Sequence, residues 1–160
     1  MLVVVSDTSP LRYLTLIGES DLIRLLYKTV VVPPSVIAEL SHPMAPARVR
    51  EFVETSPRFL EMFDSEIRPD ATLAHLDIGE RDAILVAEQL RADLLLMDDR
   101  DGVVEARSRG LAVTGTLGVL VAAAERNKID LPTAFELLKE PNFRASPGLL
   151  ESILKRTQRL

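Results

Sequence analysis

Five short, mainly apolar segments, separated by stretches in which apolar residues recur at helical spacing, constrain the fold of this chain more than any other feature. The segments are residues 2–5, 29–32, 59–63, 94–97 and 111–113. A short apolar run without polar alternation is typical of a strand buried on both faces of a parallel sheet. The alternation therefore predicts an α/β fold, in which a central parallel sheet of four to five short strands is covered by helices on both faces.

The segments between these runs predict the covering helices. Ser20 or Asp21 is placed to cap the second of two short helices, Ser35 to cap the next, and Gly110 to end a later one. The predicted helices lie in residues 11–26 (two short helices), around 36–40, around 46–55, and in 70–92, 103–109, 116–126, 132–139 and 147–156.

Length and composition narrow the class of protein. The chain has 160 residues, 47% of them hydrophobic, which predicts a single domain with a core over about 1–125 and a helical extension over about 126–160. The absence of Cys excludes disulfide scaffolds, thiol catalysis, zinc ribbons and iron–sulfur clusters. His42 and His75 are too few for a His-rich metal site, and their polar surroundings predict surface positions.

Charge and hydropathy exclude further classes. The net charge is −5, which as a global field argues against coating nucleic acid or an anionic membrane. Five Phe, two Tyr and no Trp argue against a base-stacking platform. The apolar runs are too short for a signal peptide or a membrane span, which predicts a cytoplasmic protein with no membrane partner.

Five acidic residues lie at or near the ends of predicted strands. Asp7 follows the first strand, Asp98 and Asp99 follow the strand at 94–97, Glu39 lies on the helix after the second strand, and Glu80 lies in the first turn of the long helix. Ligands of open parallel sheets bind in the crevice beyond the carboxyl ends of the strands. Because converging carboxylates repel one another unless a cation lies between them, the pattern predicts a site for a hard divalent metal.

Three of these positions also have a purely structural interpretation. Asp7 could cap the helix that follows it. Glu39 could lie on the surface of its helix, although it borders an apolar face. Asp77 and Glu80 have the spacing of a capping box, which is compatible with metal binding by Glu80. The helical face of Glu80 carries more apolar residues than that of Asp82, so Asp82 is the reserve candidate.

Two further positions at the same edge stay open. Consecutive residues at the end of a strand point to opposite faces, so only one of Asp98 and Asp99 is expected to face the crevice squarely. Thr116, in a Thr-Gly-Thr segment, could supply a hydroxyl to the crevice or could cap the helix that follows, and the second interpretation is favoured.

Read in order, several motifs resemble the PIN domain, the fold of VapC-type ribonuclease toxins. The last of the motifs resembles the tail of one PIN branch of VapC-like proteins. The motifs are VVVSDTSPL at 3–11, VVPPSVIAEL at 31–40, LDIGERDAILVAEQL at 76–90, LLLMDDRDGVVEARSRGL at 94–111, VTGTLGVL at 113–120 and NFRASPGLLESIL at 142–154.

The resemblance implies a PIN-like three-layer fold and a metal-dependent ribonuclease. In the family, acids at strand ends hold Mg²⁺ or Mn²⁺. By position Asp7 and Glu39 match the first two acids, and the third matches Glu80 in this branch or Asp82 in the commoner toxin pattern. The fourth matches the Asp98-Asp99 pair, although Met97 or Asp98 stands where the toxins have Thr or Ser. The resemblance also implies a small antitoxin partner and a homodimer.

The leading hypothesis is hydrolysis of RNA phosphodiester bonds by a metal-activated water, with the toxin of a toxin–antitoxin pair as the physiological role. The candidate catalytic and metal-ligating residues are Asp7, Glu39, Glu80, Asp98 and Asp99.

The alternatives are a catalytically silent PIN scaffold that binds RNA or protein, a receiver-like signalling domain and a phosphatase of the haloacid-dehalogenase type. The phosphatase pattern needs an acid two residues after its nucleophile, where this chain has Ser9, and the receiver needs tandem acids near the first strand. Basic residues could hold phosphate; the candidates are Arg100, Arg107, Arg109, Arg144 and Arg156.

Overall fold

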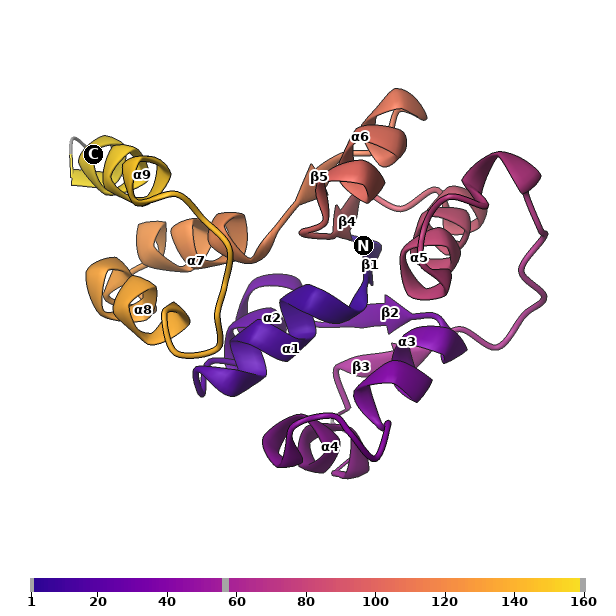
Figure 1. The fold of residues 1–160 in the computed structure, drawn as a ribbon, viewed down its shortest axis with the longest axis horizontal. Helices are drawn as coiled ribbons and strands as arrows, with labels where there is room; N and C mark the ends of the chain where they lie inside the picture. The colour runs from indigo at the N-terminus through magenta and orange to yellow at the C-terminus, as the bar shows by residue number, and fades with distance from the viewer. Residues whose placement is uncertain (1, 56–57, 159–160) are drawn as a thin grey trace.

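The five apolar segments form one sheet in which all strands run parallel, in the order β3-β2-β1-β4-β5. The computed structural model describes residues 2–55 and 58–158, and Figure 1 shows the strands at the centre of the molecule with helices around them. The strands are β1 (Val4–Ser6), β2 (Val30–Val32), β3 (Leu60–Met62), β4 (Leu94–Leu96) and β5 (Val113–Thr114). The predicted α/β class and central parallel sheet are confirmed.

All five strands differ from their predicted ranges at one end or at both, and β1 and β5 differ most clearly. β1 is displaced toward Ser6, and β5 begins at Val113 instead of residue 111. The ends of a strand are set by pairing with its neighbour, and here Ser6 pairs with Leu96, which in turn pairs with Thr114. The apolar character of the side chains does not determine where this pairing begins.

Alternate residues of the strands contribute to two separate cores. Val4 and Leu96 pack into the larger core with residues of α1 (Thr8–Leu16), α2 (Asp21–Tyr27), α7 (Thr116–Glu125) and α8 (Leu131–Leu138). Val5 and Leu95 pack against residues of α5 (Ile78–Leu90) and α6 (Arg100–Ser108). This is the side-chain period expected of a strand covered on both sides. The prediction of helices on both faces is therefore confirmed.

The described helices follow the order of the predicted segments, but the single helix predicted over 70–92 is in the structure a 3-10 turn and a separate, shorter helix. They are α1 (Thr8–Leu16), α2 (Asp21–Tyr27), α3 (Pro34–Leu40), α4 (Ala47–Glu54), the 3-10 turn η1 (Ala71–Leu73), α5 (Ile78–Leu90), α6 (Arg100–Ser108), α7 (Thr116–Glu125), α8 (Leu131–Leu138) and α9 (Pro147–Gln158).

Several capping predictions were wrong. Ser35 lies inside α3, because the helix begins at Pro34, and Ser20 makes no side-chain capping bond to α2. The helix predicted from Val103 begins at Arg100, because Asp99 accepts hydrogen bonds from two backbone N–H groups of its first turn. Gly110, with φ of +82°, follows the end of this helix as predicted.

The order of the strands places a topological switch point between β1 and β4. From β1 the chain builds the sheet outward through β2 and β3, and it then returns to add β4 and β5 on the other side of β1. The backbone N–H of Asp7 donates to the carbonyl oxygen of Leu96 at 2.9 Å, which joins the carboxyl ends of the two strands. Open α/β sheets bind ligands at this kind of position.

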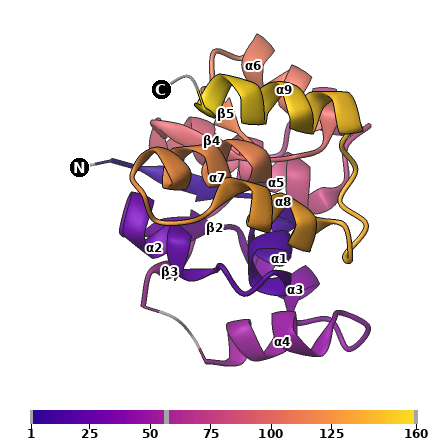
Figure 2. The ribbon, with the colours of Figure 1, turned by 90° about the vertical axis from the view of Figure 1, so that its left-hand side faces the viewer.

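The C-terminal helices extend the molecule at one end. In Figure 1, α8 and α9 lie at the end of the long axis opposite α5, and in Figure 2 this end faces the viewer. Among the described residues, no helix has the length and apolar character needed to cross a membrane.

Candidate active site

Asp7 is the acid buried most deeply at the switch point. It is 3% exposed, and its burial raises its pKa to about 7. This value also includes a backbone hydrogen bond from Thr8, which lowers the pKa, and the nearby carboxylates of Glu80, Glu39 and Asp98, which raise it. Although Asp7 is at the N-cap position of α1, its side chain makes no capping bond to that helix.

Glu39 lies beside Asp7 because two elements approach each other closely. The hydroxyl of Thr8 donates to Glu39 Oε2 at 2.8 Å, which joins α1 to α3. A Cβ atom on Gly79 would lie 3.1 Å from Glu39 Oε2 and 3.3 Å from Asp7 Oδ1. The absence of a side chain at Gly79 therefore lets the N-terminus of α5 come close to both carboxylates.

Glu80 lines the cleft at the switch point, and Asp82 does not. Burial, together with the charges of Asp99 and Asp77, raises the pKa of Glu80 to about 7. Asp82 accepts a hydrogen bond from the hydroxyl of Ser35 at 2.7 Å and lines a different surface hollow, beside Leu85. The structure thus places Glu80, and not the reserve candidate, with the other acids.

The capping box at the start of α5 is half formed. A hydrogen bond from the backbone of Asp77 to the Glu80 carboxylate lowers the pKa of Glu80, but Asp77 makes no side-chain capping bond. The predicted structural role of Glu80 and its place in the cleft therefore coexist.

Asp98 and Asp99 both line the cleft, with different partners. Asp98 is hydrogen-bonded to Thr116, whose backbone N–H and hydroxyl donate to its two carboxylate oxygens at 2.7 and 2.6 Å. Burial raises the pKa of Asp98, against these hydrogen bonds, which lower it. Asp99 is exposed and caps α6 through the N–H groups of Asp101 and Gly102. Thr116 is the first residue of α7 and holds Asp98, and it does not act as an N-cap.

The cleft has a volume of about 940 Å³, and arginines lie among its acids. Its cationic residues are Arg12, Arg100, Arg107 and Arg144. In the part of the chain that the structure describes, none of the four forms an ion pair with an acidic side chain. Guanidinium groups without carboxylate partners are suited to bind phosphate oxygens.

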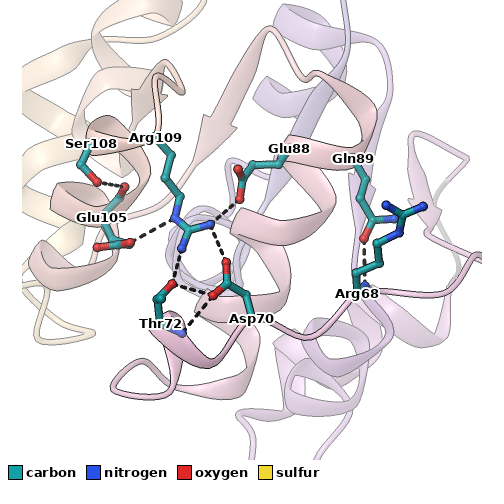
Figure 3. Close-up of polar contacts among 8 residues, drawn as sticks. All are labelled: Arg68, Asp70, Thr72, Glu88, Gln89, Glu105, Ser108 and Arg109. Atoms are coloured by element: carbon teal, nitrogen blue, oxygen red, sulfur yellow. Dashed lines mark hydrogen bonds and ion pairs between the residues drawn. The ribbon is translucent and has the colours of Figure 1, made fainter.

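Two of the predicted phosphate-binding arginines lie elsewhere. Arg109 binds Asp70, Glu88 and Glu105 at 3.1, 2.7 and 3.0 Å, as Figure 3 shows. Burial would lower the pKa of Arg109, but these carboxylates raise it above its ordinary value. Arg156 lines a separate hollow on α9. The positive charge of Arg109 and Arg156 suggested that both bind phosphate. The partners of Arg109 and the position of Arg156 place both residues outside the cleft.

Arg12 is the cleft residue that the sequence analysis missed. It follows Thr8 by four residues on α1 and therefore lies on the same helical face. Arg12 lines both the main cleft and the smaller hollow that contains Glu39. The i, i+4 spacing of Arg12 from Thr8 in the strand-end motif was the signal that could have identified this residue.

His42 and His75 are exposed, as predicted, and neither lines the main cleft.

The donor set fits a hard divalent cation in its chemistry. All five candidate acids are carboxylates, the ligands that Mg²⁺ and Mn²⁺ prefer. Among the described residues, no three acids stand close enough in their present side-chain positions to form a complete metal cage. Mg²⁺ commonly uses one or two carboxylates and several waters, so the arrangement is compatible with a partly hydrated ion.

Comparison with known proteins identifies the family. A family model described as "DUF3368: PIN domain" matches residues 3–159. In structure, the chain is similar to a PilT N-terminus domain protein from the hyperthermophilic archaeon Sulfolobus solfataricus P2, with a TM-score of 0.47 and 16% identity over 91% of this chain and 98% of that chain. No curated protein sequence matches the chain.

The family match covers nearly the whole chain, and the chain therefore belongs to the PIN-domain family, as the sequence motifs suggested. PIN domains are generally nucleases.

Proposed function

We propose that this protein is a ribonuclease that depends on Mg²⁺ or Mn²⁺, and that it is the toxin of a VapC-like toxin–antitoxin pair. The observation that carries the proposal is the shared cleft: Glu80, Asp98 and Asp99 line it together with four arginines that have no acidic partner among the described residues, and Asp7 is buried nearby. Acids can hold a metal, and arginines can hold the phosphates around the bond that is cut.

The chain's own residues have separate tasks in this proposal. Asp7, Glu39, Glu80 and Asp98 would surround the cation and bind it directly or through its water molecules, with Asp99 at the rim. Thr116 and Thr8 fix the orientation of Asp98 and Glu39 through their hydroxyls. When bound, the cation would polarise the phosphodiester and stabilise the charge that develops on its oxygens.

The test compares RNA cleavage by the wild type, Asp7→Asn and Asp82→Asn, with Mg²⁺, with Mn²⁺ and with a chelator. Asp7→Asn removes the charge of the most buried acid, and we expect it to lower the rate more than the roughly 10- to 100-fold typical of losing an outer-shell partner. Asp82→Asn makes the same change on α5 outside the cleft and should retain activity. Equal rates for wild type and Asp7→Asn would overturn the assignment.

The same variants test the toxin role in cells. Expression of the wild type should arrest growth, expression of Asp7→Asn should not, and co-expression of a small protein encoded directly beside the gene should restore growth. RNA binding without cleavage by the wild type would instead favour a catalytically silent PIN scaffold.

A further inference from the structure

The connection between α8 and α9, residues 139–146, contributes one wall of the cleft. Phe143 and Arg144 line the same cleft as Glu80 and Asp98, although they lie in the C-terminal extension. Figure 1 shows this connection as the long loop from α8 to α9. On the basis of the proposed nuclease function, we propose that Arg144 binds a backbone phosphate of the RNA strand other than the phosphate that is cleaved. We propose further that the ring of Phe143 contacts the adjoining nucleotide.

The turn after α8 fixes where these two side chains emerge. The N–H of Phe143 donates to the carbonyl oxygen of Leu138, and the N–H of Asn142 donates to that of Lys139. Asn142 has φ of +60°, so the two bonds and the left-handed residue together form a Schellman motif. The chain therefore leaves α8 in a defined direction.

An aromatic contact attaches the turn to the N-terminal helix. The rings of Phe143 and Tyr13 meet edge to face, with centroids 4.9 Å apart and an interplanar angle of 89°. Tyr13 lies on α1 next to Arg12, whose guanidinium is 5.9 Å from the centre of the Tyr13 ring. The contact attaches the loop that carries Arg144 to the helix that carries Arg12, and both arginines line the cleft together with the aromatic pair.

The acidic residues of the cleft make cationic residues necessary for the binding of RNA. RNA is a polyanion, and the acids of the cleft repel it everywhere except where a metal is bound. Arg144 is exposed and forms no ion pair in the described residues, so its guanidinium is available for a phosphate. Phe143 is half-buried and also borders the apolar hollow between α8 and α9, so it is anchored on one side and faces the cleft on the other.

The experiment measures equilibrium binding of a fluorescent single-stranded oligoribonucleotide, with a chelator present, at several salt concentrations. Arg144→Gln should weaken binding about tenfold at low salt and reduce the slope of log Kd against log salt by about 0.7, the value for one lost phosphate contact on a single strand. Arg156→Gln removes the same charge from the extension outside the cleft, and it should leave affinity and slope unchanged.

Phe143→Leu tests the aromatic wall. The variant keeps an apolar side chain over the hollow between the helices but loses the ring, and we expect about tenfold weaker binding with a smaller loss of salt slope than in Arg144→Gln. Phe52→Leu, which changes a half-buried ring on α4 that pairs with Phe59, is the matched control and should bind as the wild type does. Thermal melting of each variant verifies that it is folded.

The two proposals fail in different ways. The binding assay needs no cleavage. The effect of Arg144→Gln on RNA binding can therefore be interpreted even if the protein does not cleave RNA. An unchanged slope and affinity for Arg144→Gln, an equal effect of Arg156→Gln, or no RNA binding by the wild type would each overturn the inference. In cleavage assays, Arg144→Gln should raise KM for the oligonucleotide with little change in kcat, and it should leave cleavage of a dinucleotide, which has only the scissile phosphate, unaffected.

Discussion

The surroundings of Asp7 disfavour the ionised form of its carboxylate. Its carboxylate is almost completely buried at the end of the central strand, with other carboxylates near it. A buried carboxylate with acidic neighbours destabilises the folded state when it is ionised, unless a cation is present. Clusters with such perturbed pKa values are frequent at functional sites, which agrees with the role that we propose for Asp7.

The position of Asp7 predicts a dependence of stability on pH in the metal-free protein. Its pKa is about 7 in the fold and 3.8 ordinarily, so the folded state binds the proton more tightly. The stability that protonated Asp7 contributes is fully present below pH 3.8 and is lost as the pH rises through about 7. From pH 5 to pH 8, the wild type should lose at most about 3 kcal/mol of unfolding free energy relative to Asp7→Asn.

Urea unfolding of the two proteins in a chelator measures this difference. Glu80, whose pKa is also raised to about 7, is present in both proteins, so its own titration largely cancels in the comparison. Parallel stability curves from pH 5 to pH 8 would show that Asp7 is not buried as described.

Arg109 joins three segments that are far apart in the sequence. Its guanidinium, near the end of α6, binds Glu88 of α5, and Asp70 and Thr72 at the start of η1. Thr72 also donates its N–H to Asp70, which closes the network drawn in Figure 3. The network fixes the start of the loop that leads to α5, and α5 carries Glu80.

Replacing Arg109 should therefore loosen the loop before α5. Arg109→Ala leaves the carboxylates around it without their shared cation, and we expect amide hydrogen exchange at residues 71–74 to become about tenfold faster. Arg24→Ala removes an exposed arginine that is 3.9 Å from Asp21, and it should leave exchange at residues 71–74 unchanged. The same exchange rate in both variants would mean that the network does not hold the loop.

The sequence was sufficient for the fold class because the three central strands lie in continuous apolar runs, as in residues 94–97. The same strand ends pointed to Asp7 and Asp98, since parallel strands end at one edge of the sheet. Partners between distant elements could not be predicted this way. The ion pair between Arg109 and Asp70 and the ring contact between Phe143 and Tyr13 depend on tertiary packing. Such packing leaves no pattern in the local sequence.

Binding of a metal should also be visible as stability of the whole chain. A ligand that binds only the folded state at 100 times its Kd stabilises it by about 2.7 kcal/mol. For a domain of this size, that corresponds to a rise in Tm of roughly 5–11 °C. We expect Mn²⁺ to produce such a rise in the wild type and not in Asp7→Asn; equal shifts in both would place the ion elsewhere.

The pairing of β1 with β4 has a consequence for the newly made protein. During synthesis, Asp7, Glu39 and Glu80 are added to the chain before β4, and the backbone bond from Asp7 to Leu96 closes only when β4 docks beside β1. Asp98 and Thr116 follow still later in the chain. The complete set of acids therefore assembles only after most of the chain has been translated, so a nascent or truncated chain lacks the finished site.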